Sequence, residues 1–156
     1  MAQPDALTTD CRPARFADAE TLAAFNVALA HESEGLALDP ATVRAGVEAV
    51  LRDPARGRYF VAESEGRVIG QLMITYEWSD WRNAQLWWIQ SVYVAPAHRR
   101  RGVFRQLYHH ARGHARQAGD VCAIRLYVEN DNTPAQSTYH AQGFTDASYR
   151  VYEATV

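Results

Sequence analysis

The stretch VAPAHRRRGVFRQLY, residues 94–108, decides the fold, because it joins an apolar run to a helical one through a turn of arginines. Pro96 stops the apolar run, and Gly102 stands just before the helical one. The backbone N–H groups and the dipole at a helix start favour an anion, and a glycine lets the backbone approach that ligand. The three arginines at 99–101 therefore indicate an anion site rather than a solvated charge run.

The segments on either side of this turn predict a helix-covered sheet. Upstream, LWWIQSVYV, residues 86–94, is apolar on both alternating faces, which is typical of a central strand buried on both sides. Strict alternation puts Leu86, Trp88, Val92 and Val94 on one face and Trp87, Ile89 and Tyr93 on the other. Downstream, apolar residues at helical spacing predict a helix from Gly102 to Gly119.

The other segments complete an α/β fold with a central mixed sheet flanked by helices on both faces, in the order β-α-α-β-β-β-α-β-α-β. We expect a flexible tail over residues 1–10 and one domain over residues 11–156. The expected strands are 11–15, 59–63, 68–76, 86–94, 121–129 and 149–156. The expected helices follow N-caps at Asp18, at Asp39, with Pro40 as the first helical residue, and at Thr133, where Pro134 and Gln136 suggest a capping box. The remaining expected helix begins near Gly102.

Composition excludes several classes of protein. The chain has 156 residues, 47% of them hydrophobic, and a net charge of -2, which argues against nucleic-acid binding as its main role. Cys11 and Cys122 form no CxxC pair, so we expect a reducing, cytoplasmic compartment. No apolar run approaches the roughly 18 residues of a membrane span, and we expect no membrane partner.

Two motifs in the expected order make the chain resemble the GNAT superfamily of N-acetyltransferases. Residues 99–103 match Gln/Arg-x-x-Gly-x-Gly/Ala up to Phe104, where a bulky ring replaces the small residue. NTPAQSTYHAQGF, residues 132–144, matches Asn-x-x-Ala-x-x-x-Tyr-x-x-x-Gly-Phe. The resemblance extends from Cys11 to the end of the chain, and it implies a single-domain GNAT-like fold.

The resemblance also implies acetyl-CoA as the acetyl donor, with its pyrophosphate on the amides from Arg100 to Arg105. The pantetheine arm would follow the edge of Val92 to Val94, where two parallel strands separate. Arg99 would help to orient the phosphates, and Phe104 would pack on the core or alter the seat of the cofactor. The cofactor-binding residues so implied are Val92, Tyr93, Val94, Arg99, Arg100, Arg101, Gly102, Val103, Phe104, Arg105, Asn132 and Tyr139.

Acetyl transfer requires a polarised thioester carbonyl and a proton for the departing thiolate. Tyr139 is the candidate for the proton, since a phenol with a pKa of about 10 is protonated at neutral pH and a thiol has a pKa of about 8.5. The alternative is a tyrosine that only packs its ring on the short helix. For the carbonyl we expect a backbone N–H near Val92.

A general base is harder to identify from the sequence. Gln90 and Ser91 cannot accept a proton as a carboxylate would, so Glu77, at the end of the preceding strand, is the catalytic candidate. It could act directly or through a water molecule. A solvated carboxylate at that position is an equally good interpretation, and a water chain to bulk solvent would replace a dedicated base.

Substrate choice should reside in the loop after the first helix and in TYEWSDWRNAQLWW, residues 75–88. Acids beside tryptophans could bind a cationic amine through charge and cation–π contacts, or the aromatic connection could form a homodimer contact. The expected substrate-binding residues are Glu32, Glu34, Trp78, Asp80 and Gln90.

Three functions remain open from the sequence. The first is acetyl transfer to a primary amine of a small molecule, or to a protein lysine or N-terminus. The second is an acyl-CoA sensor without turnover, and the third is a nucleic-acid module that uses the arginines. We expect no metal, because His110 and His114 lack the glutamate of HExxH and a third ligand.

Overall fold

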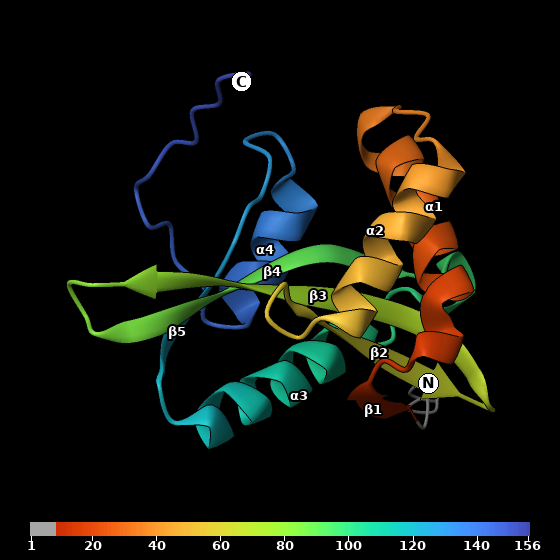
Figure 1. Ribbon diagram of the computed structural model, residues 1–156, viewed down its shortest axis with the longest axis horizontal. Coiled ribbons are helices and arrows are strands. Elements are labelled where there is room, and N and C mark those ends of the chain that lie inside the picture. The colour runs from red at the N-terminus through yellow and green to blue at the C-terminus, as the bar shows by residue number, and fades with distance from the viewer. Residues whose placement is uncertain (1–8) are drawn as a thin grey trace, which may run out of the picture. The chain divides into compact units, whose positions relative to one another are not determined.

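A five-stranded sheet in the order β1-β2-β3-β4-β5 is the centre of the fold (Figure 1). The computed structural model describes residues 9–156, which divide into a first unit ending at Leu126 and a second unit, Tyr127–Val156. Neighbouring strands are antiparallel except β4 and β5, which are parallel, so the predicted mixed sheet is confirmed. The strands are β1 (Asp10–Pro13), β2 (Arg58–Ser64), β3 (Arg67–Ser79), β4 (Ala84–Val94) and β5 (Val121–Leu126).

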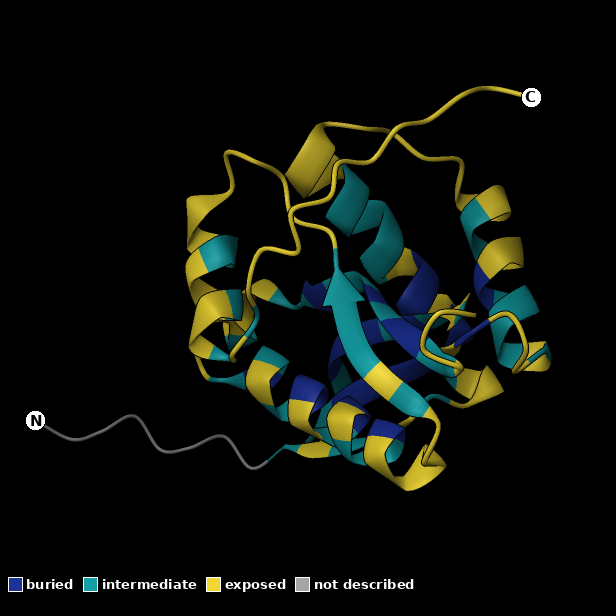
Figure 2. Ribbon diagram, turned by 90° about the vertical axis from the view of Figure 1, so that its left-hand side faces the viewer, coloured by how far each residue is buried: buried dark blue, intermediate teal, exposed yellow. Residues whose placement is uncertain are grey.

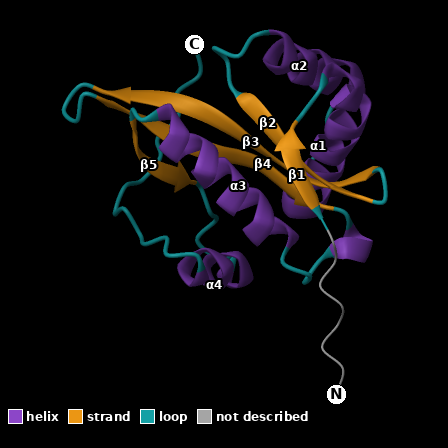
Figure 3. Ribbon diagram, turned by 90° about the horizontal axis from the view of Figure 1, so that it is seen from below, coloured by secondary structure: helices purple, strands orange, loops and turns teal. Residues whose placement is uncertain are grey.

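Helices cover both faces of this sheet, as predicted. Figures 1 and 3 show α1 (Ala19–Glu34) and α2 (Pro40–Arg52) on one face and α3 (Val103–Ala118) on the other. Two short 3-10 helices, Phe16–Asp18 and Pro96–His98, precede α1 and the turn into α3. The sequence predicted these helices because the residues that begin and end a helix, such as N-caps and left-handed glycines, act over a few residues.

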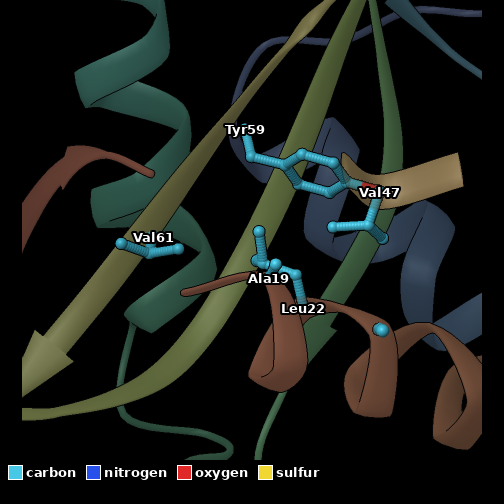
Figure 4. Close-up of a cluster of buried hydrophobic side chains, with 6 residues drawn as sticks. Ala19, Leu22, Val47, Tyr59 and Val61 are labelled. Atoms are coloured by element: carbon cyan, nitrogen blue, oxygen red, sulfur yellow. The ribbon is translucent and has the colours of Figure 1, made fainter. Parts of the chain in front are cut away.

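The core between the sheet and α1 and α2 joins three elements. Figure 4 shows Tyr59 and Val61 of β2 gathered with Ala19 and Leu22 of α1 and with Val47 of α2. All five are buried. Because the β2 side chains alternate between faces, Phe60 lies on the opposite side, where its ring contacts His110 and His114 of α3. Figure 2 shows that burial is concentrated in the sheet and on the inner sides of these helices.

The core on the α3 face depends on a close approach at Gly70 of β3. A Cβ atom added there would lie 3.0 Å from Val103 Cγ1 of α3 and 3.3 Å from the carbonyl oxygen of Tyr93. Leu107 of α3 is fully buried at the same contact. Gly70 therefore lets the first turn of α3 pack directly against the sheet, which fixes where the preceding turn lies.

A bulge interrupts β4 at Ser91. Gln71 of β3 is opposite Tyr93, whereas Met73, two residues on, is opposite Gln90, so β4 holds one extra residue between these pairs. Ser91 has φ +51°, in the left-handed region that few non-glycine residues adopt. The extra residue reverses the alternation, so the Tyr93 side chain lies on the same face of the sheet as that of Trp88. The strict alternation expected from the sequence is wrong beyond this point.

The second unit contains α4 (Thr133–Ala141). Its N-cap is Asn132, whose side chain accepts a hydrogen bond from the Ala135 amide at 3.2 Å, and not Thr133 as expected. The predicted capping box is also wrong, because the Gln136 side chain donates to the carbonyl oxygens of Glu129 and Asn130.

The expected strand at 149–156 is absent from the described structure. Residues 145–156 form no regular element and are exposed throughout (Figure 2). A strand needs a partner for its backbone groups, and the second unit contains no other strand. Favourable β propensity therefore has no ladder to join within this unit.

At the N-terminus, the expected tail falls largely on residues 1–8, which lie outside the described residues. Asp10, expected in the tail, is the first residue of β1 and pairs with Glu63. The single-domain boundary at residues 11–156 stays a prediction. Among the helices of residues 9–156, none is long and apolar enough to cross a membrane.

We predict that Gly70→Ala lowers the free energy of unfolding by about 1–3 kcal/mol, because the new methyl group overpacks the contact with Val103. Gly46→Ala in α2 is the matched control, since nothing lies within 4 Å of the added atom and alanine favours a helix. Urea denaturation of both variants measures the difference. Equal midpoints for the two variants would contradict the close approach.

Candidate functional site

The turn from β4 into α3 has the backbone of an anion site. Arg100 has φ +63° and Gly102 has φ +77°, so two left-handed residues flank Arg101 before α3 begins at Val103. Gly102 is the N-cap and has no capping side chain. The first amides of a helix have no acceptor within that helix and lie at the positive end of its dipole.

The cations around this turn have different surroundings. Arg100, Arg101 and Arg105 are exposed, and a Cβ added to Gly102 would lie 3.6 Å from Nη2 of Arg105, so the Arg105 side chain folds back over the turn. Phe104, the departure from the small-residue motif, stacks against Tyr108 one turn along α3, with the ring planes 12° apart.

Arg99 is engaged by the protein itself. Its Nη2 lies 2.6 Å from Oε2 of Glu32 on α1, and its Nε donates to the Val94 carbonyl at 2.9 Å. The Tyr93 hydroxyl donates to the other Glu32 oxygen at 2.7 Å. The guanidinium also lies 5.3 Å from the Tyr93 ring centroid. Sequence reasoning placed Arg99 on the phosphates and Glu32 on the substrate, and the structure pairs them with each other.

Contacts within the cluster of Glu32, Tyr93 and Arg99 shift the pKa values of two of its members. The hydrogen bond from Tyr93 and then that from Arg99 hold the pKa of Glu32 below its ordinary value. Burial, and then the hydrogen bond to Glu32, raise the pKa of Tyr93. At neutral pH the cluster is therefore a carboxylate held between a neutral phenol and a guanidinium.

The edge of β4 beside β5 becomes available halfway along the strand. The parallel pairing of the two strands ends at Ile89 and Leu126, and no β5 partner is described for Gln90–Val94. The expected cofactor-binding residues Val92, Tyr93 and Val94 lie on this part of β4. The family resemblance implied this separation. Nothing in the sequence indicated the conformation of Ser91 or the buried Gln71 beside it, whose Nε2 donates to the Ser91 carbonyl at 3.0 Å.

Glu77 lies on β3 in a cluster that spans three strands. Its Oε2 accepts a hydrogen bond from the Trp88 indole at 3.1 Å and from Arg125 Nη1 at 3.4 Å. The Arg125 guanidinium lies 5.8 Å from the Trp88 ring centroid. Both contacts use one oxygen of the carboxylate, and Oε1 has no hydrogen bond among those described.

The structure divides the expected substrate-binding residues. Gln90 lies on the same face of the sheet as Glu77, where its Nε2 donates to Thr75 Oγ1 at 2.5 Å. Trp78 follows Glu77 on β3 and therefore points to the opposite face, with 55% of its surface exposed. Glu34 is the exposed last residue of α1, and Asp80 lies in the turn between β3 and β4.

Tyr139 and Asn132 belong to the second unit. Tyr139 packs its ring edge-on against Phe144, with centroids 6.0 Å apart, and burial raises the pKa of its hydroxyl. The Asn132 side chain caps α4. Tyr139 therefore keeps its proton at neutral pH, which is the state required of a proton donor.

No three His, Cys, Asp or Glu side chains gather to hold a metal ion within residues 9–156. His110 and His114 lie with ring centroids 4.8 Å apart against Phe60. Burial and then the neighbouring His114 lower the pKa of His110. These histidines contribute to the packing between α3 and β2.

A family model and a solved structure that match this chain both indicate acetyltransferases. Residues 23–144 match the model of the acetyltransferase (GNAT) family. A crystal structure of a possible acetyltransferase from Clostridium difficile 630 matches with a TM-score of 0.89 and 40% identity, over 95% of this chain and 97% of that chain.

Two named relatives match over shorter regions. Streptothricin acetyltransferase of Streptomyces lavendulae is 35% identical over 100 residues, which cover 64% of this chain and 50% of that protein. Mycothiol acetyltransferase of Corynebacterium glutamicum (strain R) is 36% identical over 89 residues, which cover 54% of this chain and 29% of that protein. The match thus spans half or less of each relative's length.

We predict that Tyr93→Phe raises the pKa of Glu32, because the largest cause of its lowering is lost. Since the folded pKa is lowered, the contribution of this pairing to stability is present above the unfolded pKa and is lost as pH falls through the folded pKa. Carboxylate NMR titration measures the midpoint. Arg100→Ala is the control and should not move it; an unmoved midpoint in Tyr93→Phe would contradict the assigned pairing.

Proposed function

Because the chain belongs to the acetyltransferase (GNAT) family, we propose that it transfers an acetyl group from acetyl-CoA to a primary amine of a small molecule. One observation carries the proposal: an unpaired strand edge leads through left-handed Arg100 and Gly102 into the start of α3. That arrangement offers amides to a pyrophosphate and backbone groups to a pantetheine arm on one continuous stretch of chain.

The residues at the turn are compatible with coenzyme A. Gly102 leaves the backbone open, since only the flexible Arg105 side chain lies within 4 Å of an added Cβ atom. Arg100, Arg101 and Arg105 supply positive charge to the phosphates, while Arg99, tied to Glu32, holds the turn in place. Phe104 lies against Tyr108, which supports a turn that is not closed by the bulky ring.

In the proposed reaction, bound acetyl-CoA supplies the thioester that the amine attacks. A backbone N–H near Val92 would donate to the carbonyl oxygen, as sequence reasoning expected. Tyr139 would donate its proton to the departing sulfur, and its raised pKa supports a protonated phenol. Overall, the acetyl group moves from sulfur to nitrogen, the thiol receives the Tyr139 proton, and solvent would return the proton released by the amine to the phenolate.

We propose Glu77 as the proton acceptor for the amine, directly or through a water molecule. The arrangement that supports this role is its free oxygen: Arg125 and Trp88 both bond to Oε2 and so orient Oε1. Gln90, on the same face, would contact the acceptor. Glu34 would add negative charge at the end of α1, where Glu32 is already neutralised by Arg99.

A small-molecule acceptor is supported by the two named relatives, whose names refer to streptothricin and mycothiol. We extend only the class of acceptor to this chain. Transfer to a protein lysine or N-terminus is the alternative acceptor class. We also propose a homodimer, for which Trp78 and Trp81, 55% and 94% exposed at the β3–β4 hairpin, supply contact surface, and Asp80 lies between them.

We predict that acetyl-CoA raises the melting temperature, since a ligand at 100 times its Kd stabilises a fold by about 2.7 kcal/mol. Gly102→Val should abolish this shift. Gly119→Val is the matched control, because Gly119 at the other end of α3 also has a positive φ, of +79°, and the substitution should destabilise without removing the ligand response. No shift in the unmodified protein at saturating acetyl-CoA would refute the proposed donor.

We predict that Tyr139→Phe lowers kcat about 100-fold or more while the Kd for coenzyme A stays unchanged, because only the transferable proton is lost. Thiol release with an amine panel measures turnover, and calorimetry measures binding. Tyr152→Phe, at an exposed tyrosine of the same unit, is the control. Unchanged turnover in Tyr139→Phe would remove Tyr139 from the mechanism, and binding without turnover in the unmodified protein would favour an acyl-CoA sensor.

A further inference from the structure

Gln71 of β3 is a fully buried polar side chain in the core of the first unit. Its Nε2 donates to Asn26 Oδ1 of α1 at 2.7 Å and to the carbonyl oxygen of Ser91 at 3.0 Å. Asn26 in turn donates to the Tyr59 hydroxyl of β2 at 3.0 Å. This Gln71 network therefore links α1, β2 and β3 to the bulge of β4.

The orientation of the Gln71 amide follows from its neighbours. Oε1 is buried without a hydrogen-bond partner among the described residues, which is energetically unfavourable. Turning the amide over would place Oε1 against two oxygens, those of Asn26 and Ser91, and lose both hydrogen bonds. In the observed orientation Gln71 therefore leaves Oε1 without a hydrogen bond and donates from Nε2 to the Ser91 carbonyl.

The direction of the Ser91 carbonyl also determines the direction of the Val92 N–H, because both groups belong to the same peptide unit. Ser91 has φ +51°, a strained backbone conformation for serine, and its carbonyl oxygen accepts the hydrogen bond from the buried Gln71 amide. The Ser91–Val92 peptide is trans, so the Val92 N–H points opposite to the Ser91 carbonyl. Since that carbonyl is held by the Gln71 side chain, the Val92 N–H points away from Gln71, and no β5 partner is described for this part of β4.

We propose that Gln71 is a positioning residue for acetyl transfer: it holds the Ser91 carbonyl inward so that the Val92 N–H is directed at the thioester carbonyl oxygen. The inference rests on the proposed function and deepens it. Gln71 touches no reacting atom, because it acts through the Ser91–Val92 peptide. A donor fixed before the substrate arrives needs no reorganisation during the reaction, which is the main advantage of such groups.

The test uses Gln71→Met, which keeps the side-chain length and removes the donor. Acetyl-CoA labelled with 13C at the thioester carbonyl is bound without an amine, and infrared difference spectroscopy measures the carbonyl band. In the unmodified protein we expect the band to lie at lower frequency than in free acetyl-CoA, because a hydrogen bond weakens the C=O bond. In Gln71→Met we expect the band to return toward the free value, kcat to fall about tenfold or more, and the Kd for coenzyme A to change less than twofold.

Leu72→Val is the matched control, because Leu72 is the next residue of β3, is fully buried and faces away from the network. It should lower stability and leave the carbonyl band unmoved, so general loosening of the core is excluded. If Gln71→Met does not fold, Gln71→Met/Asn26→Leu carries the same expectation, since it also removes the amide left without a donor.

An unmoved band in the Gln71 variants, or a bound band identical to the free one in the unmodified protein, would overturn the role of Gln71. Neither result depends on turnover. Failure of the proposed function would appear separately, as binding of acetyl-CoA with a shifted band but no acetylation of any amine.

Discussion

The interruption of β4 at Ser91 is the constraint on which the rest of the site depends. A regular strand would alternate its backbone groups between both neighbours, and β3 and β5 would use them all. The extra residue lies where one carbonyl turns to the buried Gln71 amide, and the pairing of β4 with β5 ends two residues earlier, at Ile89. The sheet thereby gains an edge in its interior, and the buried Gln71 amide stabilises a backbone conformation that serine alone disfavours.

The same change of register determines the charges near the turn. Because Tyr93 lies on the α1 face, its hydroxyl reaches Glu32, and Glu32 reaches Arg99. Three consecutive arginines repel one another, and neutralising one of them lowers that repulsion while it anchors the turn to α1. The remaining cations, Arg100, Arg101 and Arg105, are exposed and can meet an anion. The turn thus combines one arginine that is paired within the protein with three exposed arginines.

Local sequence signals predicted most of the fold, whereas contacts between residues far apart in the chain could not be predicted from the sequence. Asp39 and Gly119 mark helix ends because caps act over a few residues. Ser91 carries no periodic signal, so the reversed face of Tyr93 could not be foreseen. Glu32 and Arg99 are 67 residues apart, and each is a sensible ligand-binding residue on its own. The prediction of a strand at 149–156 was wrong for a related reason. A strand needs a partner strand, and the second unit contains none.

Two carboxylates on the same face of the sheet differ in what they can still do. Glu32 uses both oxygens, one for Tyr93 and one for Arg99, and its lowered pKa makes it a poor proton acceptor. Glu77 accepts from both of its donors on Oε2, and within residues 9–156 no hydrogen bond to its Oε1 is described. A base must be oriented and must keep an oxygen that can accept the proton, and this geometry is what supports Glu77 as the proposed base. In the proposed reaction, Glu32 would therefore anchor Arg99 on the cofactor side, and Glu77 would accept the proton of the amine.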